Sequence, residues 1–433
     1  MSVNTKCVLA YSGGLDTSAI VPWLIDQSYE VHAVLVDVGQ NEDLPAVCEK
    51  ALRFGAATAI IRDAKPAMYK SVVPLTIGLG ATYEGTYRLG TALARPFIAL
   101  EQIERARQLG GATLVHGATG KGNDQIRFEF AYRTLAPQYP VLAPWKVWDF
   151  QGRQDLVDFL RKKNLDENFE VTKDYSLDEN LWHLSVEGGE LEDPDACLDV
   201  QKVLSAVADR FGGDAVCEEG PESLTIAFDE GVPTAIDGTP TSLPELIGWL
   251  NRAYRHAPWA WDLVIENRFT GIKSRGLYIN PAAKLLHFAV DALARTCLNK
   301  TVYDQYADLG RQYGTMLYRG EYFSQQSDML ETAGWSIMKH LTGSVTVQLS
   351  PAPYASRIDA PGGIFTQSAS TFERSDFAHR DAEGFIHLSW LSSVGRPSSE
   401  DNHADVVEEK DATAPDVRPD QQLVGSGLVP AAT

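Results

Sequence analysis

The chain has 433 residues, of which 44% are hydrophobic and 22% are charged, a composition typical of globular proteins. A chain of this length usually folds into two or three domains of ~100–200 residues each. Its formal net charge of -20 disfavours a nucleic-acid partner, because proteins bind phosphate backbones through clustered Lys and Arg.

The cysteines give no sign of a disulfide framework, a zinc site or a redox pair. They are scattered along the chain, without a C-x-x-C pair, at Cys7, Cys48, Cys197, Cys217 and Cys297. The N-terminal residues lack the apolar core of a secretory signal, and no stretch of about 18 apolar residues is long enough to span a membrane. We therefore expect a reduced, cytoplasmic protein with no membrane partner.

Strand-like and helix-like segments alternate over the first ~150 residues. The expected strands are Lys6–Tyr11, Val31–Val36, Thr58–Arg62 and Thr113–His116, and the expected helices are Thr17–Gln27, Leu44–Phe54 and Thr91–Leu109. This alternation predicts an α/β fold with a Rossmann-like, doubly wound parallel sheet. In such sheets ligands bind at the carboxyl ends of the strands, where both glycine-rich loops of this chain fall.

The pattern changes after about Gly152 and predicts a second domain of mixed α+β type. Its expected strands include Leu224–Phe228 and Val345–Leu349, and its expected helices include Ser242–Tyr254 and Lys284–Leu298. Residues Ser399–Thr433 hold eight acidic and two basic side chains with three prolines, a composition that predicts a disordered tail. We thus expect a nucleotide-binding domain over 1–165, a synthetase domain that also serves oligomerisation over 166–395, and an acidic tail over 396–433.

The first expected strand runs into Ala10–Ser18, with the sequence AYSGGLDTS. Glycines let the backbone approach a phosphate closely, and N–H groups at a helix N-terminus attract anions. Asp16 is the candidate ligand for a magnesium ion that bridges phosphate oxygens, since magnesium prefers carboxylate oxygen. The simpler alternative is an ordinary strand–turn–helix junction in which Asp16 or Thr17 caps the helix. The coincidence of glycines, an acid and hydroxyls in the first β–α turn favours a nucleotide loop.

A second loop follows the fourth expected strand at His116–Arg127, with the sequence HGATGKGNDQIR. It combines flexible glycines with Lys121, Asn123, Asp124 and Arg127. An arginine recognises a carboxylate by paired hydrogen bonds, and a carboxylate recognises an ammonium group. The set is therefore suited to both ends of an amino acid, while the alternative is a solvated loop with a charged helix start.

The first loop resembles the S-G-G-x-D-[ST] loop of the PP-loop ATP pyrophosphatases, which cleave ATP between the α and β phosphates. Together, the two loops resemble argininosuccinate synthases. Further blocks with this resemblance follow in order: Asp37–Gln40 (DVGQ), Tyr87–Pro96 (YRLGTALARP), Ala143–Trp145 (APW), Tyr175–Ser185 (YSLDENLWHLS), Glu187–Pro194 (EGGELEDP) and Val264–Tyr278 (VIENRFTGIKSRGLY). The resemblance extends over nearly the whole chain apart from the tail.

The resemblance implies a role for each matching residue. ATP would be bound by Ala10, Tyr11, Ser12, Gly13, Gly14, Leu15, Asp16, Thr17, Ser18, Val36 and Gly117. Aspartate would be bound by Thr119, Asn123 and Asp124. The citrulline site would comprise Tyr87, Ala92, Asn123, Arg127, Ser176, Ser185, Glu266 and Tyr278. The residues closest to the chemistry would be Asp16, Lys121 and Asp124, with no metal beyond the magnesium that accompanies ATP.

The implied reaction has two steps and belongs to arginine biosynthesis and the urea cycle. The ureido oxygen of citrulline attacks the α phosphorus of ATP and expels pyrophosphate, and the nitrogen of aspartate then displaces AMP. The protein's task would be to position the reactants and stabilise charge. The resemblance also implies ATP and Mg2+ as cofactors, citrulline and aspartate as the small-molecule partners, and a homotetramer.

Several residues have structural alternatives or depart from the family pattern. Tyr87 and Tyr278 alone are more often packing aromatics, Glu266 has Arg268 and Arg275 as nearby pairing partners, and His116 and His183 are not assigned as general bases. Ala92 stands where many members carry a serine, the segment 279–286 (INPAAKLL) departs from the usual Glu-Thr-Pro-Gly-Gly, and the chain end lacks the family's basic helix. These departures leave open a specialised ligase with another ureido acid or amine, and a catalytically silent paralogue that acts as a scaffold. A tRNA-modifying PP-loop enzyme is disfavoured by the net charge.

Overall fold

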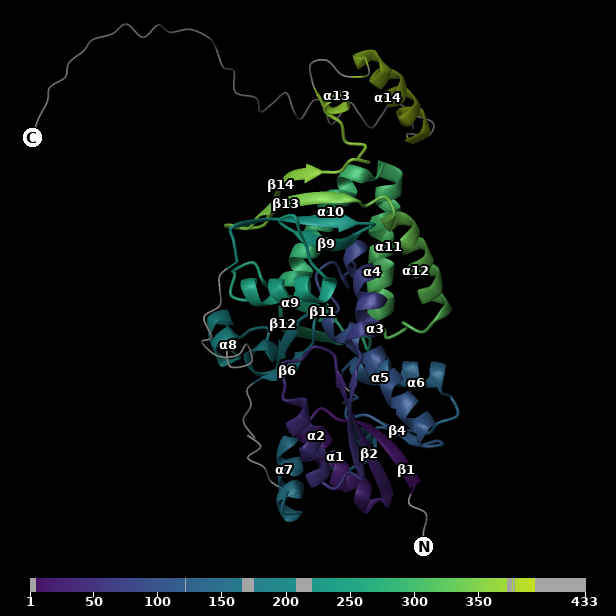
Figure 1. Cartoon of the computed structure of the whole chain (residues 1–433), viewed down its shortest axis with the longest axis vertical. Helices are drawn as coiled ribbons and strands as arrows, with labels where there is room; N and C mark the ends of the chain where they lie inside the picture. The colour runs from purple at the N-terminus through teal and green to yellow at the C-terminus, as the bar shows by residue number, and fades with distance from the viewer. Residues whose placement is uncertain are drawn as a thin grey trace, which may run out of the picture. The chain divides into compact units, whose positions relative to one another are not determined.

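The computed structural model describes residues 5–120, 122–165, 175–207, 220–371, 376 and 378–393 (Figure 1). By their contacts, the residues group into two compact units, Met1–Ile364 and Phe365–Thr433. Lys121 and the expected acidic tail lie outside the described residues. The division of the chain at residues 165 and 395 stays a prediction.

The first part of the chain forms a five-stranded parallel sheet (Figure 1). Its strands are β1 (Thr5–Ala10), β2 (Tyr29–Asp37), β3 (Thr58–Asp63), β4 (Thr113–Val115) and β5 (Val141–Leu142), in the order β3-β2-β1-β4-β5. The helices of this part are α1 (Leu15–Asp26), α2 (Leu44–Arg53), α5 (Gly90–Gln108), α6 (Asp124–Leu135) and α7 (Arg153–Lys162). The doubly wound parallel sheet predicted from the sequence is thereby confirmed.

Both faces of this sheet are buried because successive side chains of a strand point to opposite faces. Val8 and Val34 face the core that α5 covers, whereas Leu9 and Leu35 face the core that α1 and α7 cover. Strands buried on both sides need continuous apolar runs. This need explains why the β1 and β2 sequences are so rich in Val, Leu and Ala.

The strand order reverses between β1 and β4, which are adjacent and parallel. The first glycine loop leaves β1 and the second leaves β4. Connections that diverge from neighbouring strands open a crevice at the carboxyl edge of a doubly wound sheet. The two loops therefore lie side by side at the switch point of the sheet.

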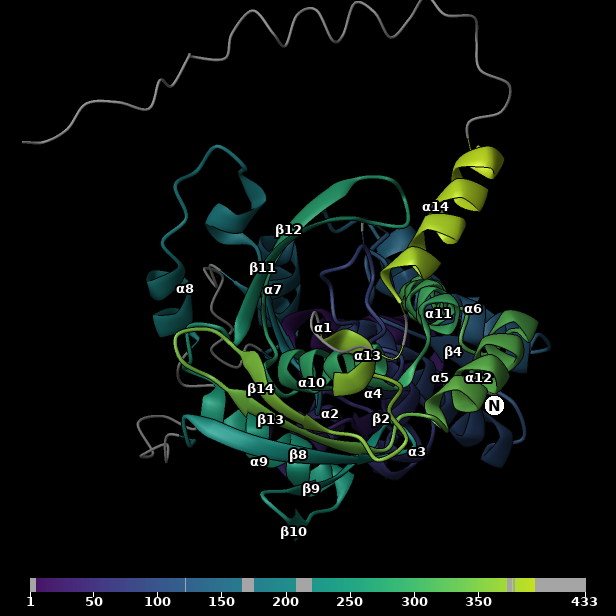
Figure 2. The same cartoon turned by 90° about the horizontal axis from the view of Figure 1, so that it is seen from above.

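Two antiparallel sheets and several helices form the rest of the larger unit. One sheet has the order β10-β9-β8-β13-β14 and comprises β8 (Ser223–Asp229), β9 (Val232–Ile236), β10 (Thr239–Pro240), β13 (Gly343–Gln348) and β14 (Tyr354–Asp359). The other has the order β11-β12-β7-β6 and comprises β6 (Ser176–Glu179), β7 (Leu184–Glu187), β11 (Trp261–Asn267) and β12 (Lys273–Ile279). The helices are α8 (Val200–Ala206), α9 (Leu243–Tyr254), α10 (Pro281–Cys297), α11 (Lys300–Tyr318) and α12 (Gln325–Met338). In Figure 2, α10 lies along the sheet that contains β13 and β14.

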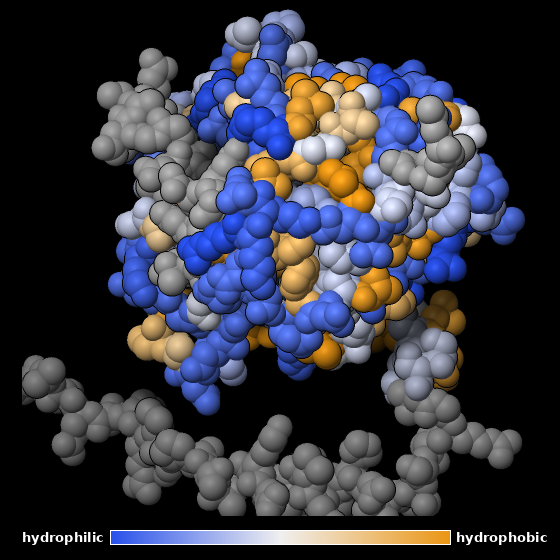
Figure 3. Space-filling view, turned by 90° about the horizontal axis from the view of Figure 1, so that it is seen from below, coloured by the Kyte–Doolittle hydropathy of each residue, from blue (hydrophilic) through white to orange (hydrophobic). Residues whose placement is uncertain are grey.

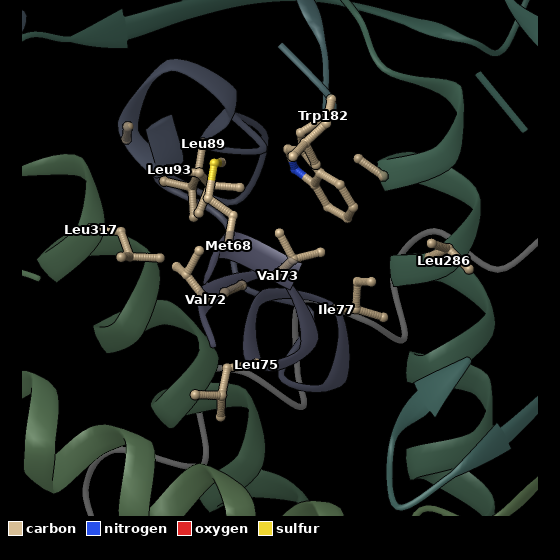
Figure 4. Close-up of a cluster of buried hydrophobic side chains, with 14 of the residues drawn as sticks. Met68, Val72, Val73, Leu75, Ile77, Leu89, Leu93, Trp182, Leu286 and Leu317 are labelled. Atoms are coloured by element: carbon tan, nitrogen blue, oxygen red, sulfur yellow. The ribbon is translucent and has the colours of Figure 1, made fainter. Parts of the chain in front are cut away.

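The short helices α3 (Lys65–Lys70) and α4 (Val72–Gly78) tie the two parts of this unit together. Every residue of α4 is buried, and α4 packs against α10, α11 and α12. Figure 4 shows its side chains between Leu317 of α11 and Leu286 of α10. The parallel and antiparallel sheets therefore share one hydrophobic core rather than meeting at a loose hinge.

The smaller unit contains α13 (Gln367–Ser370) and α14 (His379–Ser393). Within the described residues no helix has both the length and the apolar character needed to cross a membrane. The face shown in Figure 3 is covered mostly by hydrophilic residues, with smaller apolar areas among them.

Candidate active site

A cavity of about 300 Å³ opens at the switch point of the parallel sheet. Its walls come from the ends of β1 and β2, from both glycine loops, and from α5 and β6. Most residues predicted to bind ATP line it, namely Ala10, Tyr11, Ser12, Gly14, Asp16, Thr17, Val36 and Gly117. The predicted residues Gly13, Leu15 and Ser18 do not line the cavity.

Hydrogen bonds within the first loop hold it open toward the cavity. The Ser12 amide donates to Oγ1 of Thr17 over 3.3 Å, and the Tyr11 and Ser18 hydroxyls are 3.1 Å apart. Gly13 has a φ of +74°, and a Cβ there would lie 2.6 Å from Cγ1 of Val47. Only glycine fits this position without strain.

The N-terminus of α1 points its amide groups at the same cavity. Gly14 is the N-cap residue, and no side chain accepts a hydrogen bond at the cap. The alternative in which Asp16 or Thr17 caps the helix is therefore wrong, because both residues lie inside α1, after its N-cap residue Gly14. An uncapped helix N-terminus leaves N–H donors available for an anion.

The second loop touches the first. A Cβ at Gly117 would lie 3.0 Å from Cγ2 of Thr17 and 3.3 Å from Cδ1 of Ile20, so any larger residue would require these side chains to shift by a few tenths of an ångström. His116 stabilises the turn, since its Nδ1 accepts a hydrogen bond from the Ala118 amide over 3.2 Å. The histidine is fully buried and is thus a structural residue, as the simpler interpretation held.

A second cavity of about 260 Å³ adjoins the first, since Ala118, Asp124 and Asp178 line both. It is walled by α5, α6 and the sheet that contains β6, β7, β11 and β12. The residues predicted to bind amino acids line it, namely Tyr87, Thr119, Asn123, Asp124, Arg127, Ser176, Ser185, Glu266 and Tyr278. Ala92 lines neither cavity and is fully buried in the core.

Two buried groups of opposite charge face the second cavity with unused hydrogen-bonding capacity. Arg127 is 3% exposed; its Nη1 donates to Asp124 over 2.9 Å, whereas its Nη2 has no hydrogen-bond partner among the described residues. Glu266 is 5% exposed, and within the same part of the chain its Oε2 has no partner either. Leaving such groups unpaired costs free energy, of order 1–3 kcal/mol for neutral groups and more for charged ones. The pair therefore fits a ligand with a carboxylate at one end and an ammonium group at the other.

Burial raises the pKa of Glu266 to about 7; Arg127 opposes the rise and Glu187 adds to it. The simpler interpretation paired Glu266 with Arg268 or Arg275. Arg268 does lower the pKa of Glu266 by electrostatic attraction, and it also pairs with Glu187 over 3.5 Å. Arg275 instead donates to the backbone oxygens of Glu190 and Leu191.

Two tyrosine rings, Tyr87 and Tyr278, line this cavity, and His183 packs against them. The Tyr87 and Tyr278 ring centres are 4.8 Å apart, and His183 stacks on Tyr278 at 5.9 Å. His183 Nε2 lies 3.3 Å from the Thr91 hydroxyl oxygen. Burial, with Arg95 and Arg127 nearby, lowers the pKa of His183 to about 3. The imidazole is therefore neutral near pH 7 and supports the tyrosines rather than acting as a general base.

Asn123 joins the second loop to the antiparallel hairpin. Its Nδ2 donates to the Tyr318 hydroxyl over 2.7 Å, and its Oδ1 accepts from the Phe269 amide over 2.8 Å. The Tyr318 ring in turn stacks on Tyr83 with centres 3.6 Å apart. These contacts hold the β11–β12 turn at the edge of the second cavity.

Sequence reasoning missed several residues that line the cavities, and Lys121 lies outside the described residues. The missed polar residues include Thr91, Arg95, Asp178, Glu187 and Arg268. Thr91 and Arg95 are four residues apart on α5, a spacing that places two side chains on one helix face. That spacing was the available signal, because Tyr87–Pro96 was already a motif of interest.

Comparisons with known proteins agree over most of the chain. A family model described as the arginosuccinate synthase N-terminal HUP domain matches residues 6–166, and one described as the arginosuccinate synthase C-terminal domain matches residues 175–394. An argininosuccinate synthase of Caldicellulosiruptor saccharolyticus is 38% identical over 395 residues, which cover 90% of this chain and 96% of the relative. One of Idiomarina loihiensis is 40% identical over 398 residues, which cover 91% and 97%. One of Caldanaerobacter subterraneus is 38% identical over 412 residues, which cover 94% and 99%.

Proposed function

Because the chain belongs to the argininosuccinate synthase family, we propose that its two adjoining cavities divide the substrates of that ligase between them. The protein is a ligase that forms a C–N bond: it joins citrulline to aspartate and cleaves ATP to AMP and pyrophosphate. The first cavity takes ATP and the second takes citrulline. We also propose that residues 1–165 form the nucleotide-binding domain and residues 166–395 the synthetase domain.

The first cavity suits ATP because it combines a close backbone approach with free amide donors. The α1 N-terminus and the Ser12–Gly14 turn would hold the phosphates, and Val36 would contact the adenine. Asp16 lines this cavity, and burial raises its pKa while Arg153 opposes the rise. In the described part of the chain, no group of three or more His, Cys, Asp or Glu side chains forms a metal site. Mg2+ would bind to Asp16 together with the substrate phosphates and neutralise their charge, since this ion is usually held by one or two carboxylates plus phosphate oxygens.

The observation that carries the proposal is the pair of buried, unsatisfied groups of Arg127 and Glu266 in one cavity. Citrulline would place its carboxylate on Nη2 of Arg127 and its ammonium group near Glu266. Ser176, Ser185 and the tyrosine wall would complete the site. Aspartate would bind through Thr119, Asn123 and Asp124, with Asp124 on the border between the cavities.

The adjoining cavities would bring the ureido oxygen of citrulline beside the α phosphorus of ATP. Attack forms the O–P bond of citrullyl-AMP and expels pyrophosphate, and the aspartate nitrogen then displaces AMP. Holding reactants in such geometry can contribute roughly 7–11 kcal/mol to lowering the barrier. We keep Asp16, Lys121 and Asp124 as the residues closest to this chemistry.

The departures from the family pattern do not favour a changed substrate. Ala92 is buried in the core, and the residues of 279–286 line neither cavity. The scaffold alternative would leave the buried groups of Arg127 and Glu266 without any purpose that offsets their cost.

We further propose a homotetramer that works in the cytoplasm, in arginine biosynthesis and the equivalent step of the urea cycle. The support for assembly is α14, which exposes apolar side chains on much of its surface, namely Phe385, Ile386, Leu388, Trp390 and Leu391. A cluster of exposed apolar residues of this kind usually marks an interaction surface.

The test is a substrate panel with the purified protein, ATP and Mg2+. Citrulline and aspartate together should release AMP and pyrophosphate, and mixtures lacking either amino acid should not form argininosuccinate. Homocitrulline, and glutamate in place of aspartate, serve as matched alternatives. AMP release that does not depend on citrulline would overturn the assignment, and preference for another ureido acid or amine would favour the specialised ligase.

A further inference from the structure

Arg95 lies where the two cavities meet, and no role has been given to it so far. It is on α5, its side chain is 14% exposed, and it lines the first cavity. Both of its ion-pair partners, Asp124 and Asp178, line the first and the second cavity. The guanidinium group is therefore at the border that the ureido oxygen must cross to reach the nucleotide.

Two carboxylates hold this guanidinium in one orientation. Its Nε donates to Oδ2 of Asp124 over 3.0 Å, and its Nη2 donates to Oδ2 of Asp178. The remaining nitrogen, Nη1, makes no hydrogen bond to any residue that the structure describes. A planar guanidinium anchored at two corners presents its third corner in a defined direction, which a flexible lysine cannot do.

Among the described residues that line the first cavity, Arg95 is the only Lys or Arg. The same cavity is also lined by the acidic side chains of Asp16, Glu42 and Glu179. A triphosphate brings several negative charges into such a cavity and needs compensating positive charge. At the end of the cavity nearest to the second one, Arg95 is the described side chain that supplies it.

We propose that Arg95 is a further catalytic residue. Its Nη1 donates a hydrogen bond to a non-bridging oxygen of the α-phosphate during adenylation. This inference rests on the proposed function. In the step, the ureido oxygen forms a bond to the α phosphorus, and the bond from that phosphorus to the β-bridging oxygen breaks with its electron pair leaving on pyrophosphate. Arg95 neither gains nor loses a proton. It stabilises the negative charge that the phosphoryl oxygens carry while both bonds are partial.

The two anchoring carboxylates make this stabilisation effective. A donor already oriented toward the developing charge does not have to reorganise at the moment of reaction, so it favours the transition state over the bound substrate. Removing one preorganised donor of this kind typically lowers turnover about 100-fold or more. Asp178 is thus a positioning residue, because it acts on the reaction through Arg95.

The test compares R95K and R95Q with R88Q as the matched control. Arg88 precedes α5, is 16% exposed and pairs with Asp262 over 3.5 Å, but it lines neither cavity. Asp262 keeps a second partner in Lys284 when Arg88 is lost. With citrulline, aspartate, ATP and Mg2+, both Arg95 variants should lose about 100-fold in kcat, with the KM for citrulline within about threefold of wild type. R88Q should keep kcat within about threefold.

The second readout is the rate with the two diastereomers of ATP that carry sulfur on the α-phosphate. Wild type should discriminate between them, and R95K should lose much of that discrimination because Nη1 no longer contacts the substituted oxygen. D178N keeps the Arg95 cation but weakens one of the two contacts that anchor its guanidinium group. This variant should lose about tenfold in kcat and keep the discrimination between the diastereomers. If R95Q fails to fold, R95K decides.

An R95K enzyme with near-normal kcat, or with an unchanged preference between the diastereomers, overturns the role of Arg95. Loss of activity in R88Q equal to that in R95K also overturns it, since the effect would then follow from structural damage. Absence of citrulline-dependent AMP release in wild type would instead contradict the proposed function itself.

Discussion

Glu266 lines the second cavity with a buried carboxyl group. The pKa of this group is raised to about 7, chiefly because burial disfavours its charged form. A ligand ammonium group favours the ionised form, so its binding lowers this pKa and releases a proton wherever the free protein holds Glu266 protonated. Citrulline affinity therefore increases with pH. Citrulline binds best above pH 7, and its binding weakens as the pH falls through 7.

The dissociation constant of citrulline should therefore be about tenfold higher at pH 6 than at pH 8, given a free-protein pKa of about 7. Isothermal titration at both pH values, in buffers of different ionisation enthalpy, measures the affinity and the released proton together. E266Q is the control and should bind weakly at both pH values. Equal affinity of wild type at pH 6 and pH 8 would contradict the role of Glu266.

Gly117 shows how one missing side chain sets the spacing of the two loops. A Cβ at this position would meet Thr17 at 3.0 Å and Ile20 at 3.3 Å, so in G117A the side chains of Thr17 and Ile20 must shift by a few tenths of an ångström. Overpacking of this kind costs about 1–3 kcal/mol, and we expect ATP affinity to fall about tenfold or more while the fold is retained. Nucleotide titration checks this. G152A is the control, since nothing lies within 4 Å of a Cβ there, and equal ATP affinity in G117A and G152A would refute the close contact.

At the scale of residues, the sequence motifs identified most of the residues that line the cavities, but not the contacts that hold these residues in place. The residues of the two loops reach the cavities as predicted, because β1 and β4 are neighbours in the sheet. Arg95 was missed because its orientation depends on a hydrogen bond to Asp178, which is 83 positions away in the chain. Ala92 was placed in the site by family position, whereas on α5 it faces the core.

At the scale of elements, the predicted strands agree with β1 to β4 within two residues at most ends, since buried parallel strands have a strong apolar signature. The helix α4 was not predicted at all. Its sequence VVPLTIG is buried on every side, so it has no polar face and no helical periodicity to detect. The pairing of β6 and β7 with β12 depends on contacts far apart in sequence and was equally invisible.

The same burial makes α4 sensitive to substitution. Ile77 is fully buried, and its truncation to alanine should destabilise the fold by about 2–5 kcal/mol through lost burial and a residual cavity. Ile61, which is 41% exposed on β3, is the matched control and should lose much less. Urea unfolding midpoints compare the two variants. A similar midpoint for I77A and I61A would show that α4 does not carry the shared core.

At the scale of the whole molecule, α14 presents a large exposed apolar surface. Phe385 is 74% exposed and Leu388 is 68% exposed. We expect the double substitution F385S and L388S to lower the assembly state, because the apolar contact between copies is lost. Light scattering after size exclusion gives the mass. An unchanged tetramer in the variant, or a monomeric wild type, would contradict the proposed assembly through this helix.

We have proposed that two glycine loops at one sheet edge hold ATP and citrulline so closely that the ureido oxygen attacks the α phosphorus. The most direct measurement uses citrulline labelled with oxygen-18 in its ureido group. Mass spectrometry then examines the AMP that is formed in a single turnover of the complete reaction. We expect the AMP to carry one labelled oxygen on its phosphate. AMP formed without the label would contradict it.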